Sequence, residues 1–230
     1  MRKLLITLVV LAIVLIGADF ALRFIATDQI GKVVQSELGL DTAPNVSISG
    51  FPFVLQAING EYEAINATLP ATTLGPVADV AVNLDLLGVR IPLSDALAGN
   101  ANALTAASSR VRVVMPVASI AAAVGLPDLA ISQQGSGLLA SATLTVLGQR
   151  FPVSATLDAT VVDSRLELRT GEITGAGVTV PAEVLQTVSA LVNLSIPFTD
   201  LPFTITSGTV SVVSSGLVLD AATSALGFAR

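Results

Sequence analysis

The stretches 140-ASATLTV-146 and 153-VSATLDATV-161 decide the fold, because an apolar side chain occupies every second position in both. Successive side chains of a β-strand point to opposite faces, so a period of two predicts strands with one apolar and one polar face. The same alternation recurs along much of the chain, at 80–86, 110–113, 165–169 and 203–206. The sequence therefore predicts an α+β fold dominated by a long antiparallel sheet with one apolar face.

Two similar segments, 87-LGVRIPLS-94 and 147-LGQRFPVS-154, are predicted to connect such strands. Each is interpreted as a two-residue Gly-x hairpin followed by a strand whose proline marks an edge or a bulge. Their similarity fits either an internal duplication or two hairpins built under the same steric rules, and we favour the second explanation.

Three segments depart from the period of two and are predicted to be helices. The first has apolar residues at helical spacing over 26–38 and stops at a glycine, and the second begins at Pro116 and ends before Gly125. The third begins at Pro181 and has one apolar face formed by Val184, Val188 and Leu191. Each helix is apolar on one side, so the helices either close a filled core on the sheet or face it across a partly filled slot.

The N-terminus has the pattern of an export signal. Arg2 and Lys3 precede fifteen uncharged residues, 4–18, which as a helix reach about 22 Å. This length suits a cleaved signal peptide, but the apolar segment can be extended to Ala26 with Asp19 and Arg23 near the outer interface, which suits an uncleaved anchor. We favour the anchor, because no clean Ala-x-Ala cleavage site precedes Asp19. The expected organisation is a signal peptide or anchor at 1–26 and a single domain at 27–230.

The composition excludes several kinds of chemistry. The chain has no histidine, cysteine or tryptophan, so His-based triads, thiolate nucleophiles, ordinary zinc, haem or Fe–S sites, disulfides and acylated cysteines are impossible. Glu61 and Glu63 are the nearest approach to paired carboxylates, and we interpret them as a solvated strand edge. We expect no catalytic residue, no metal and no cofactor, and therefore no enzyme.

The charge balance argues against nucleic acid as a partner. Eleven basic and seventeen acidic residues give a net charge of −6, and without residues 1–26 the remaining eight basic and sixteen acidic residues give −8. The chain is 52% hydrophobic with a mean hydropathy of +0.80, which one export segment does not explain. The exported part must bury much aliphatic surface or present it to an apolar ligand.

The segment 50-GFPF-53 is the most specific motif in the chain. Phenylalanines are few here, and several lie beside prolines, as Phe51 and Phe53 do. Proline fixes the bend between two predicted strands, and the rings either plug the end of the sheet or lie at the mouth of an apolar cavity or at a membrane surface.

This corner, with Gln56 and Gly60 after it, and the C-terminal 201-LPF-203, 210-VSV-212 and 215-SGL-217 resemble the LmeA-like phospholipid-binding family of exported actinobacterial envelope proteins. The resemblance covers nearly the whole chain in order. It implies a fold similar to tubular lipid-binding (TULIP-like) domains, in which a long curved antiparallel sheet wraps around helices and an acyl-chain cavity. It also implies binding of glycerophospholipids and a role in envelope lipid or lipoglycan biogenesis.

Lipid binding needs little beyond aliphatic walls, because each buried methylene contributes about 0.8 kcal/mol. We expect the apolar walls to come from inward strand and helix faces, with the two aromatic residues at the mouth: Phe51, Phe53, Val82, Leu84, Leu144, Val146, Leu157, Val161, Val184, Val188 and Leu191. Arg110 and Arg112 share a strand face and are the candidate phosphate contacts, although a solvated strand face is the more common role of such a pair.

The expected partners are thus a phospholipid and a membrane, with transfer of the lipid a further option. The protein is expected in the cell envelope, on the periplasmic side of the cytoplasmic membrane, either anchored by its N-terminal helix or released after cleavage. The competing hypothesis is a structural or interaction protein of the envelope with a filled core and no lipid.

Overall fold

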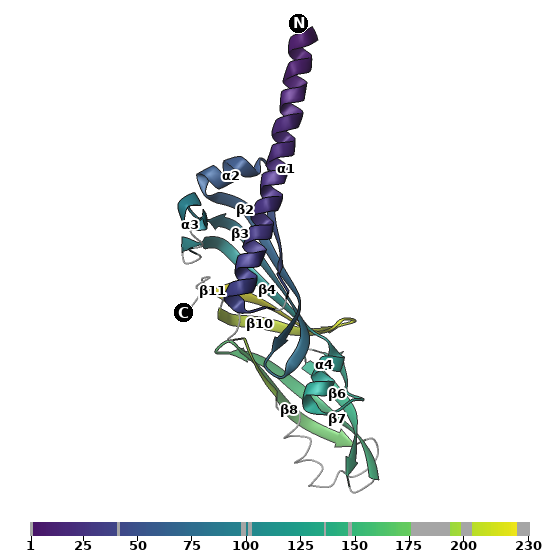
Figure 1. Cartoon of the computed structure of the whole chain (residues 1–230). Helices are drawn as coiled ribbons and strands as arrows, with labels where there is room; N and C mark the ends of the chain where they lie inside the picture. The colour runs from purple at the N-terminus through teal and green to yellow at the C-terminus, as the bar shows by residue number, and fades with distance from the viewer. Residues whose placement is uncertain are drawn as a thin grey trace. The chain divides into compact units, whose positions relative to one another are not determined.

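The computed structural model describes residues 2–40, 42–97, 100, 103–135, 137–146, 149–175, 194–198 and 204–224. The chain divides into two compact units. Unit 1 comprises Met1–Leu69, Leu84–Ser109 and Ala225–Arg230, and unit 2 comprises Pro70–Asn83 and Arg110–Ser224. Long antiparallel sheets and a long N-terminal helix confirm the predicted α+β class (Figure 1).

Unit 1 is built around a long helix, α1 (Arg2–Leu38), which continues through residue 26 without a break. The C-terminal part of α1 lies beside β1 (Asn45–Ser49), which pairs antiparallel with β2 (Glu61–Leu74) (Figure 1). Unit 1 also contains two short helices, α2 (Phe53–Asn59) and α3 (Leu93–Leu97), and parts of two strands of the first sheet. Alternation decides which residues of β1 point inward, because Val46 and Ile48 are buried and their neighbours are exposed.

The N-terminal part of α1 extends away from the strands of unit 1. Over Arg2–Ser36 the helix is long and apolar enough to cross a membrane, with a mean hydropathy of 2.7 in its most apolar window, and only 6% of that window is buried. The exposed side chains from Leu4 to Ile16 therefore have no protein core to pack into.

The first sheet has six strands in the order β1-β2-β3-β4-β11-β10, with β3 at Val77–Arg90, β4 at Thr105–Met115, β10 at Thr204–Val213 and β11 at Gly216–Ser224. The last strand of the chain pairs antiparallel with β4, where Leu217 faces Met115. Alternation is again the rule in β3, where Val80, Val82, Leu84 and Leu86 are buried.

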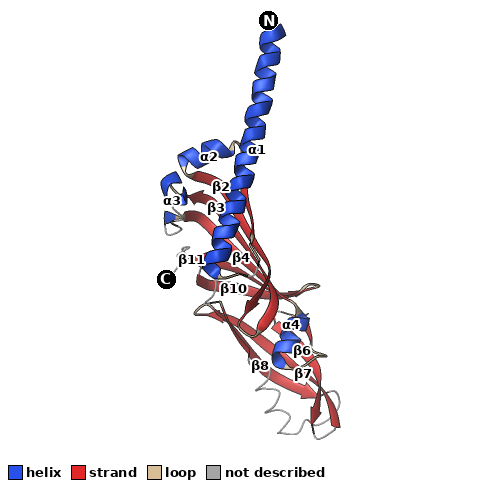
Figure 2. Cartoon of the chain, in the orientation of Figure 1, coloured by secondary structure: helices blue, strands red, loops and turns tan. Residues whose placement is uncertain are grey.

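The second sheet lies in unit 2 and has five antiparallel strands in the order β5-β6-β7-β8-β9 (Figure 2). These are Ala130–Gln134, Gly137–Val146, Gln149–Val162, Arg165–Gly175 and Leu194–Pro197. The predicted second helix is confirmed as α4 (Val117–Val124), with Pro116 as its N-cap and Gly125 in the left-handed conformation that ends it.

The two predicted hairpins have different outcomes. At 147–154 the flanking strands β6 and β7 are confirmed, but the Gly-x turn is not, because Gln149 is already a residue of β7 and faces Val146 of β6. The prediction at 87–94 is wrong, because β3 continues through Gly88 to Arg90 and Pro92 is followed by α3. Gly88 has a φ of +58° within the strand, and a Cβ there would lie 2.9 Å from that of Ala107, so this glycine allows a close approach rather than a turn.

The prediction that the corner at 50–53 joins two strands directly is wrong. The corner leads into α2, which begins at Phe53 after the N-cap Pro52 and ends at Gly60 in the left-handed conformation. Seven residues are too few to reveal a helical period in the sequence, although a proline before and a glycine after a helix are typical of its ends. The third predicted helix, from Pro181, lies outside the described residues.

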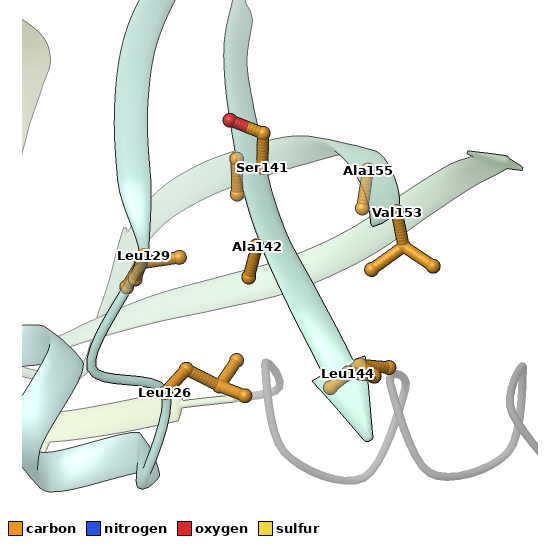
Figure 3. Close-up of a pocket in the computed structure, with 8 residues that line it drawn as sticks. Leu126, Leu129, Ser141, Ala142, Leu144, Val153 and Ala155 are labelled. Atoms are coloured by element: carbon orange, nitrogen blue, oxygen red, sulfur yellow. The ribbon is translucent and has the colours of Figure 1, made fainter. Parts of the chain in front are cut away.

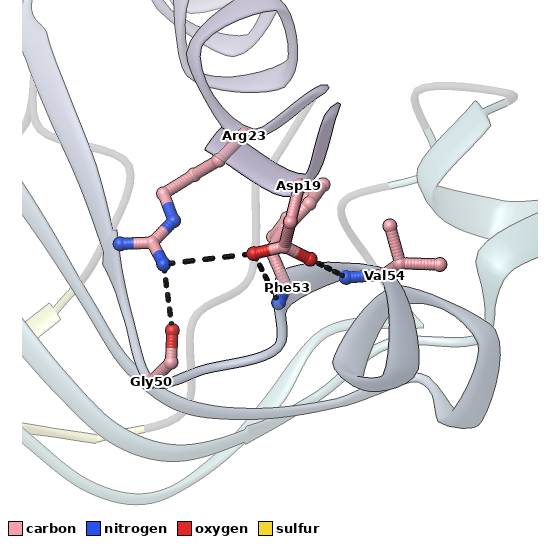
Figure 4. A network of polar contacts seen from close by, with 5 residues as sticks. All are labelled: Asp19, Arg23, Gly50, Phe53 and Val54. Atoms are coloured by element: carbon pink, nitrogen blue, oxygen red, sulfur yellow. Dashed lines mark hydrogen bonds and ion pairs between the residues drawn. The ribbon is translucent and has the colours of Figure 1, made fainter. Parts of the chain in front are cut away.

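A buried carboxylate joins α1 to this corner (Figure 4). Asp19, only 4% exposed, accepts hydrogen bonds from the backbone N–H groups of Phe53 (3.0 Å) and Val54 (2.9 Å). Pro52 has no side chain that could cap α2, so Asp19 serves as the cap from another helix. Arg23, one turn further along α1, donates to the carbonyl of Gly50 (2.9 Å) and lies 4.0 Å from the Asp19 carboxylate.

We predict that Asp19→Ala loosens the start of α2, because two amides lose a charged acceptor. Hydrogen exchange of the Phe53 and Val54 amides in the full-length chain should accelerate by about tenfold or more. Asp28→Ala is the matched control on the same helix, since Asp28 is exposed and its carboxylate pairs with Lys32, also on α1, at 2.6 Å. Equal exchange in the two variants would contradict the proposed capping role of Asp19.

A second prediction concerns Gly60, which has a φ of +67°. Its backbone N–H donates to the carbonyls of Gln56 and Ala57 in the last turn of α2. A Cβ there would lie 2.7 Å from the carbonyl oxygen of Ile91, so Gly60→Ala adds a backbone clash to the cost of a left-handed residue. Gly125 has a φ of +71°, and a Cβ there would meet nothing within 4 Å. The substitution Gly125→Ala therefore loses only the free energy needed to hold alanine in the left-handed conformation. We expect losses of about 3 and about 1 kcal/mol in the free energy of unfolding, respectively. Equal losses in denaturant titrations would be inconsistent with the clash.

Candidate functional site

An apolar layer between α4 and the five-stranded sheet is the candidate functional site. Helix α4 places Ile120 and Ala121 on its buried face, and the inward residues of β6, β7 and β8 supply the opposite wall. Two small pockets lie in this layer, and both are bordered by Leu129 and Ala140. Apart from the hydroxyl of Ser141, their side chains carry no polar atom.

The first pocket lies between the segment after α4 and strands β6 and β7 (Figure 3). Its lining side chains are small or aliphatic: Leu126, Leu129, Ala140, Ser141, Ala142, Leu144, Val153 and Ala155. The second pocket is formed by α4, the segment after it and all five strands of the sheet: Ile120, Val124, Leu129, Ile131, Ala140, Leu157, Leu168 and Leu194.

Both pockets are nearly closed in this structure. Each has a volume of about 10 Å³, which is room for about one water molecule. Sites that hold drug-sized ligands have volumes of about 300–1,000 Å³. A ligand of that size therefore does not fit in either pocket as the described residues enclose it.

A hydrogen bond holds that segment against the sheet. The carboxylate of Asp128, between Leu126 and Leu129, accepts from the backbone N–H of Thr143 at 2.9 Å. Hydrogen bonding from Thr143, aided by the positive charge of Arg150, holds the pKa of Asp128 below its ordinary value. The carboxylate is thus ionised at neutral pH, and its hold on β6 is lost only as the pH falls through this lowered pKa.

Of the residues that we expected to line a cavity, Leu144 and Leu157 border the two pockets. Val82 and Leu84 are buried on β3 in the six-stranded sheet, and Val161 is half-buried on β7. The side chain of Val146 and the whole of Val184, Val188 and Leu191 lie outside the described residues. Their predicted role in lining a lipid site stays a prediction.

Several residues that border the two pockets are not among those that we expected to line a lipid cavity. Ile120 and Val124 could have been found, because they lie on the apolar face of the predicted helix at 116–124. Leu126 and Leu129 follow that helix in a segment without any period, so no pattern in the sequence marks them.

The two phenylalanines of the corner have different environments. Phe53 is buried at 7% exposure, with its ring centroid 6.4 Å from that of Tyr62, and burial raises the pKa of the Tyr62 hydroxyl. Phe51 is 58% exposed and stacks on Phe20 of α1, with 6.4 Å between the ring centroids. The Phe53 ring therefore belongs to the core of unit 1, and the Phe51 ring lies on its surface.

The candidate phosphate contacts lie on the exposed face of β4. The guanidinium of Arg112 binds both carboxylate oxygens of Asp220 on β11, at 2.6 and 3.2 Å. Arg110, two residues away and exposed, faces Ala222 in the register of the same strands. The carboxylate of Asp220 competes with any phosphate for Arg112, so Arg110 is the better placed of the two.

Comparison with curated proteins and with solved structures returns no significant match. A family model described as LmeA-like phospholipid-binding matches residues 17–222. The match includes Asp19, the corner at 50–53, the apolar layer under α4 and most of the final strand, and it leaves out most of the exposed apolar part of α1. The resemblance stated from the sequence is thus confirmed, and the chain belongs to the LmeA-like phospholipid-binding family.

Proposed function

We propose that the protein binds glycerophospholipids without catalysis and holds their acyl chains in the apolar layer between α4 and the five-stranded sheet. The main support is that the described residues lining this layer have apolar side chains, with Ser141 as the exception. The chain that contains this layer is a member of a phospholipid-binding family. Each methylene that moves from water into such a layer contributes about 0.8 kcal/mol, so aliphatic walls alone can hold a lipid tail.

The proposed location is the outer side of the cytoplasmic membrane, in the cell envelope. Helix α1 supports this location, because it is long and apolar enough to span a bilayer and begins with Arg2 and Lys3, which favour the inner face. In this proposal residues 1–26 form the anchor and residues 27–230 the lipid-binding domain. Removal of residues 1–26 would delete the hydrogen bonds of Asp19 and Arg23 to the corner, which favours retention of the helix over cleavage after Ala26.

The proposed role in the cell is to hold or transfer phospholipid for envelope lipid or lipoglycan biogenesis. An anchored domain remains next to its lipid source, so transfer requires no free diffusion. Arg110 on β4 is the proposed contact for a lipid phosphate, supported by its exposure and by its freedom from the Asp220 pair that holds Arg112.

One observation favours a second function, that of a structural or interaction protein with a filled core. The two pockets together have room for only about two water molecules, so the described part of the layer is closed without a ligand. Lipid analysis of the full-length protein distinguishes the two functions.

We predict that the full-length chain, purified in a mild detergent, carries phospholipid that mass spectrometry detects. A phospholipid with a photoactivatable group on its acyl chain should form adducts within 117–131 and 138–168, because these segments enclose the layer. Absence of bound lipid, together with adducts confined to α1, would favour the filled-core function.

Ala140→Phe should weaken this cross-linking, because Ala140 borders both pockets and is only 4% exposed. Overpacking of a small site by a large ring costs about 1–3 kcal/mol, so we expect a decrease in adducts of roughly tenfold. Thr145→Phe is the matched control, since Thr145 is exposed on the opposite face of β6. Circular dichroism checks that both variants fold. Equal cross-linking in two folded variants would contradict the binding of acyl chains between α4 and the five-stranded sheet.

A further inference from the structure

Five exposed apolar side chains lie on α1, the corner and α2, and α1 contacts both the corner and α2. Phe20 and Phe24 of α1 are 55% and 73% exposed, Phe51 of the corner is 58% exposed, and Leu55 and Ile58 of α2 are 55% and 64% exposed. We call these five residues the corner patch. All of them belong to unit 1, and none takes part in the apolar layer under α4.

The corner patch is held in place by the contacts beneath it. Phe20 and Phe51 stack at 6.4 Å with 29° between their ring planes, which joins the helix side of the patch to the corner. Asp19 binds the first amides of α2 and so fixes that helix against α1. Leu55 and Ile58, three residues apart, share the outer face of α2, while Phe53 points into the core.

The corner patch lacks charge. No ionisable residue occurs from Phe51 to Gly60. The two charged residues of α1 nearby contact protein groups. Asp19 is buried and accepts two backbone amides, and the Arg23 guanidinium donates to the Gly50 carbonyl and lies 5.1 Å from the centre of the Phe20 ring, while its Nε has no hydrogen-bond partner in the described part of the chain. Asp19 and Arg23 are the only charged residues between Leu4 and Thr27, and they lie 4.0 Å from each other, so their opposite charges offset one another and lower the cost of entry into lipid.

If α1 spans the membrane, as the proposed function requires, its length sets the depth of the corner patch in the bilayer. A bilayer core of about 30 Å requires about 20 helical residues, so a span that begins at Leu4 ends near residue 23. Phe20 lies within that span, near its outer end. Phe51 is stacked on Phe20 and must therefore lie at a similar depth.

We propose that the corner patch inserts into the outer-leaflet interface of the bilayer that α1 spans, so that the membrane is its binding partner. Phenylalanine and leucine on one face of a short helix are typical of surfaces that enter the boundary between headgroups and acyl chains. The acidic net charge of the chain offers no attraction to anionic lipid, so the contact is apolar and insensitive to salt.

The absence of tryptophan from the chain allows a direct test. Single variants Phe51→Trp, Leu55→Trp and Ile58→Trp of the full-length chain are reconstituted in phosphatidylcholine–phosphatidylglycerol vesicles with brominated acyl chains, which quench nearby indole fluorescence. Leu11→Trp, within the span, reports whether α1 is in the bilayer. Val33→Trp is the matched water-exposed control, because Val33 is 47% exposed on the same helix and lies about 20 Å beyond Phe20 along its axis.

We expect quenching at positions 51, 55 and 58 to exceed that at 33 by about threefold, because an interfacial helix buries its apolar face about 5–10 Å into the boundary. The emission maxima at these positions should lie to the blue of that at 33, and added salt should change neither result. Quenching at 11 combined with values at 51, 55 and 58 equal to that at 33 would overturn the insertion and leave the anchor intact.

Three other outcomes also decide the matter. Quenching at 51, 55 and 58 without quenching at 11 would support the patch as a membrane contact and overturn the anchor. Absence of quenching at all four positions would overturn both. Blue-shifted emission at 51, 55 and 58 without quenching would mean that protein covers the patch, such as a second copy of the chain, and would overturn the insertion.

Discussion

The buried carboxylate of Asp19 is the interaction on which the arrangement of unit 1 depends. Asp19 belongs to α1, yet its carboxylate accepts hydrogen bonds from the first backbone N–H groups of α2, more than thirty residues later in the chain. A buried carboxylate is costly without partners, so its presence commits α1 to the position in which those amides reach it. The arginine one turn further along then binds the corner from the other side. These contacts link the apolar helix to a defined surface of the domain.

Much of the fold could be predicted from the sequence, because alternation is a strong signal wherever one face of a sheet is buried. The buried residues of β6 and β7 lie at even-numbered and odd-numbered positions respectively, such as Leu138, Ala140 and Leu144 in β6, and α4 begins and ends at the proline and glycine that mark it. The errors occurred where short-range signals are ambiguous. Gly88 has the backbone conformation of a turn residue but lies inside β3, and α2 is too short for a period to show.

The candidate site was harder to predict, because its members are set by tertiary contacts. Leu144 and Leu157 could be named from the inward face of a strand, and both border the pockets. The segment of Leu126 and Leu129 reaches the sheet through the bond from Thr143 to Asp128, which no local pattern reveals. The role of Asp19 was hidden for a similar reason, since its partners are backbone amides and every residue type except proline carries one.

The close packing of the layer under α4 has a thermodynamic consequence for any ligand that it takes up. A ligand that binds only a separated form of the layer pays the free energy of that separation first, so its apparent affinity falls in proportion to the population of the separated form. The same condition makes uptake and release depend on the rate of local opening rather than on diffusion. A ligand held in this layer would stay bound for as long as the helix remains closed and would exchange when the layer opens.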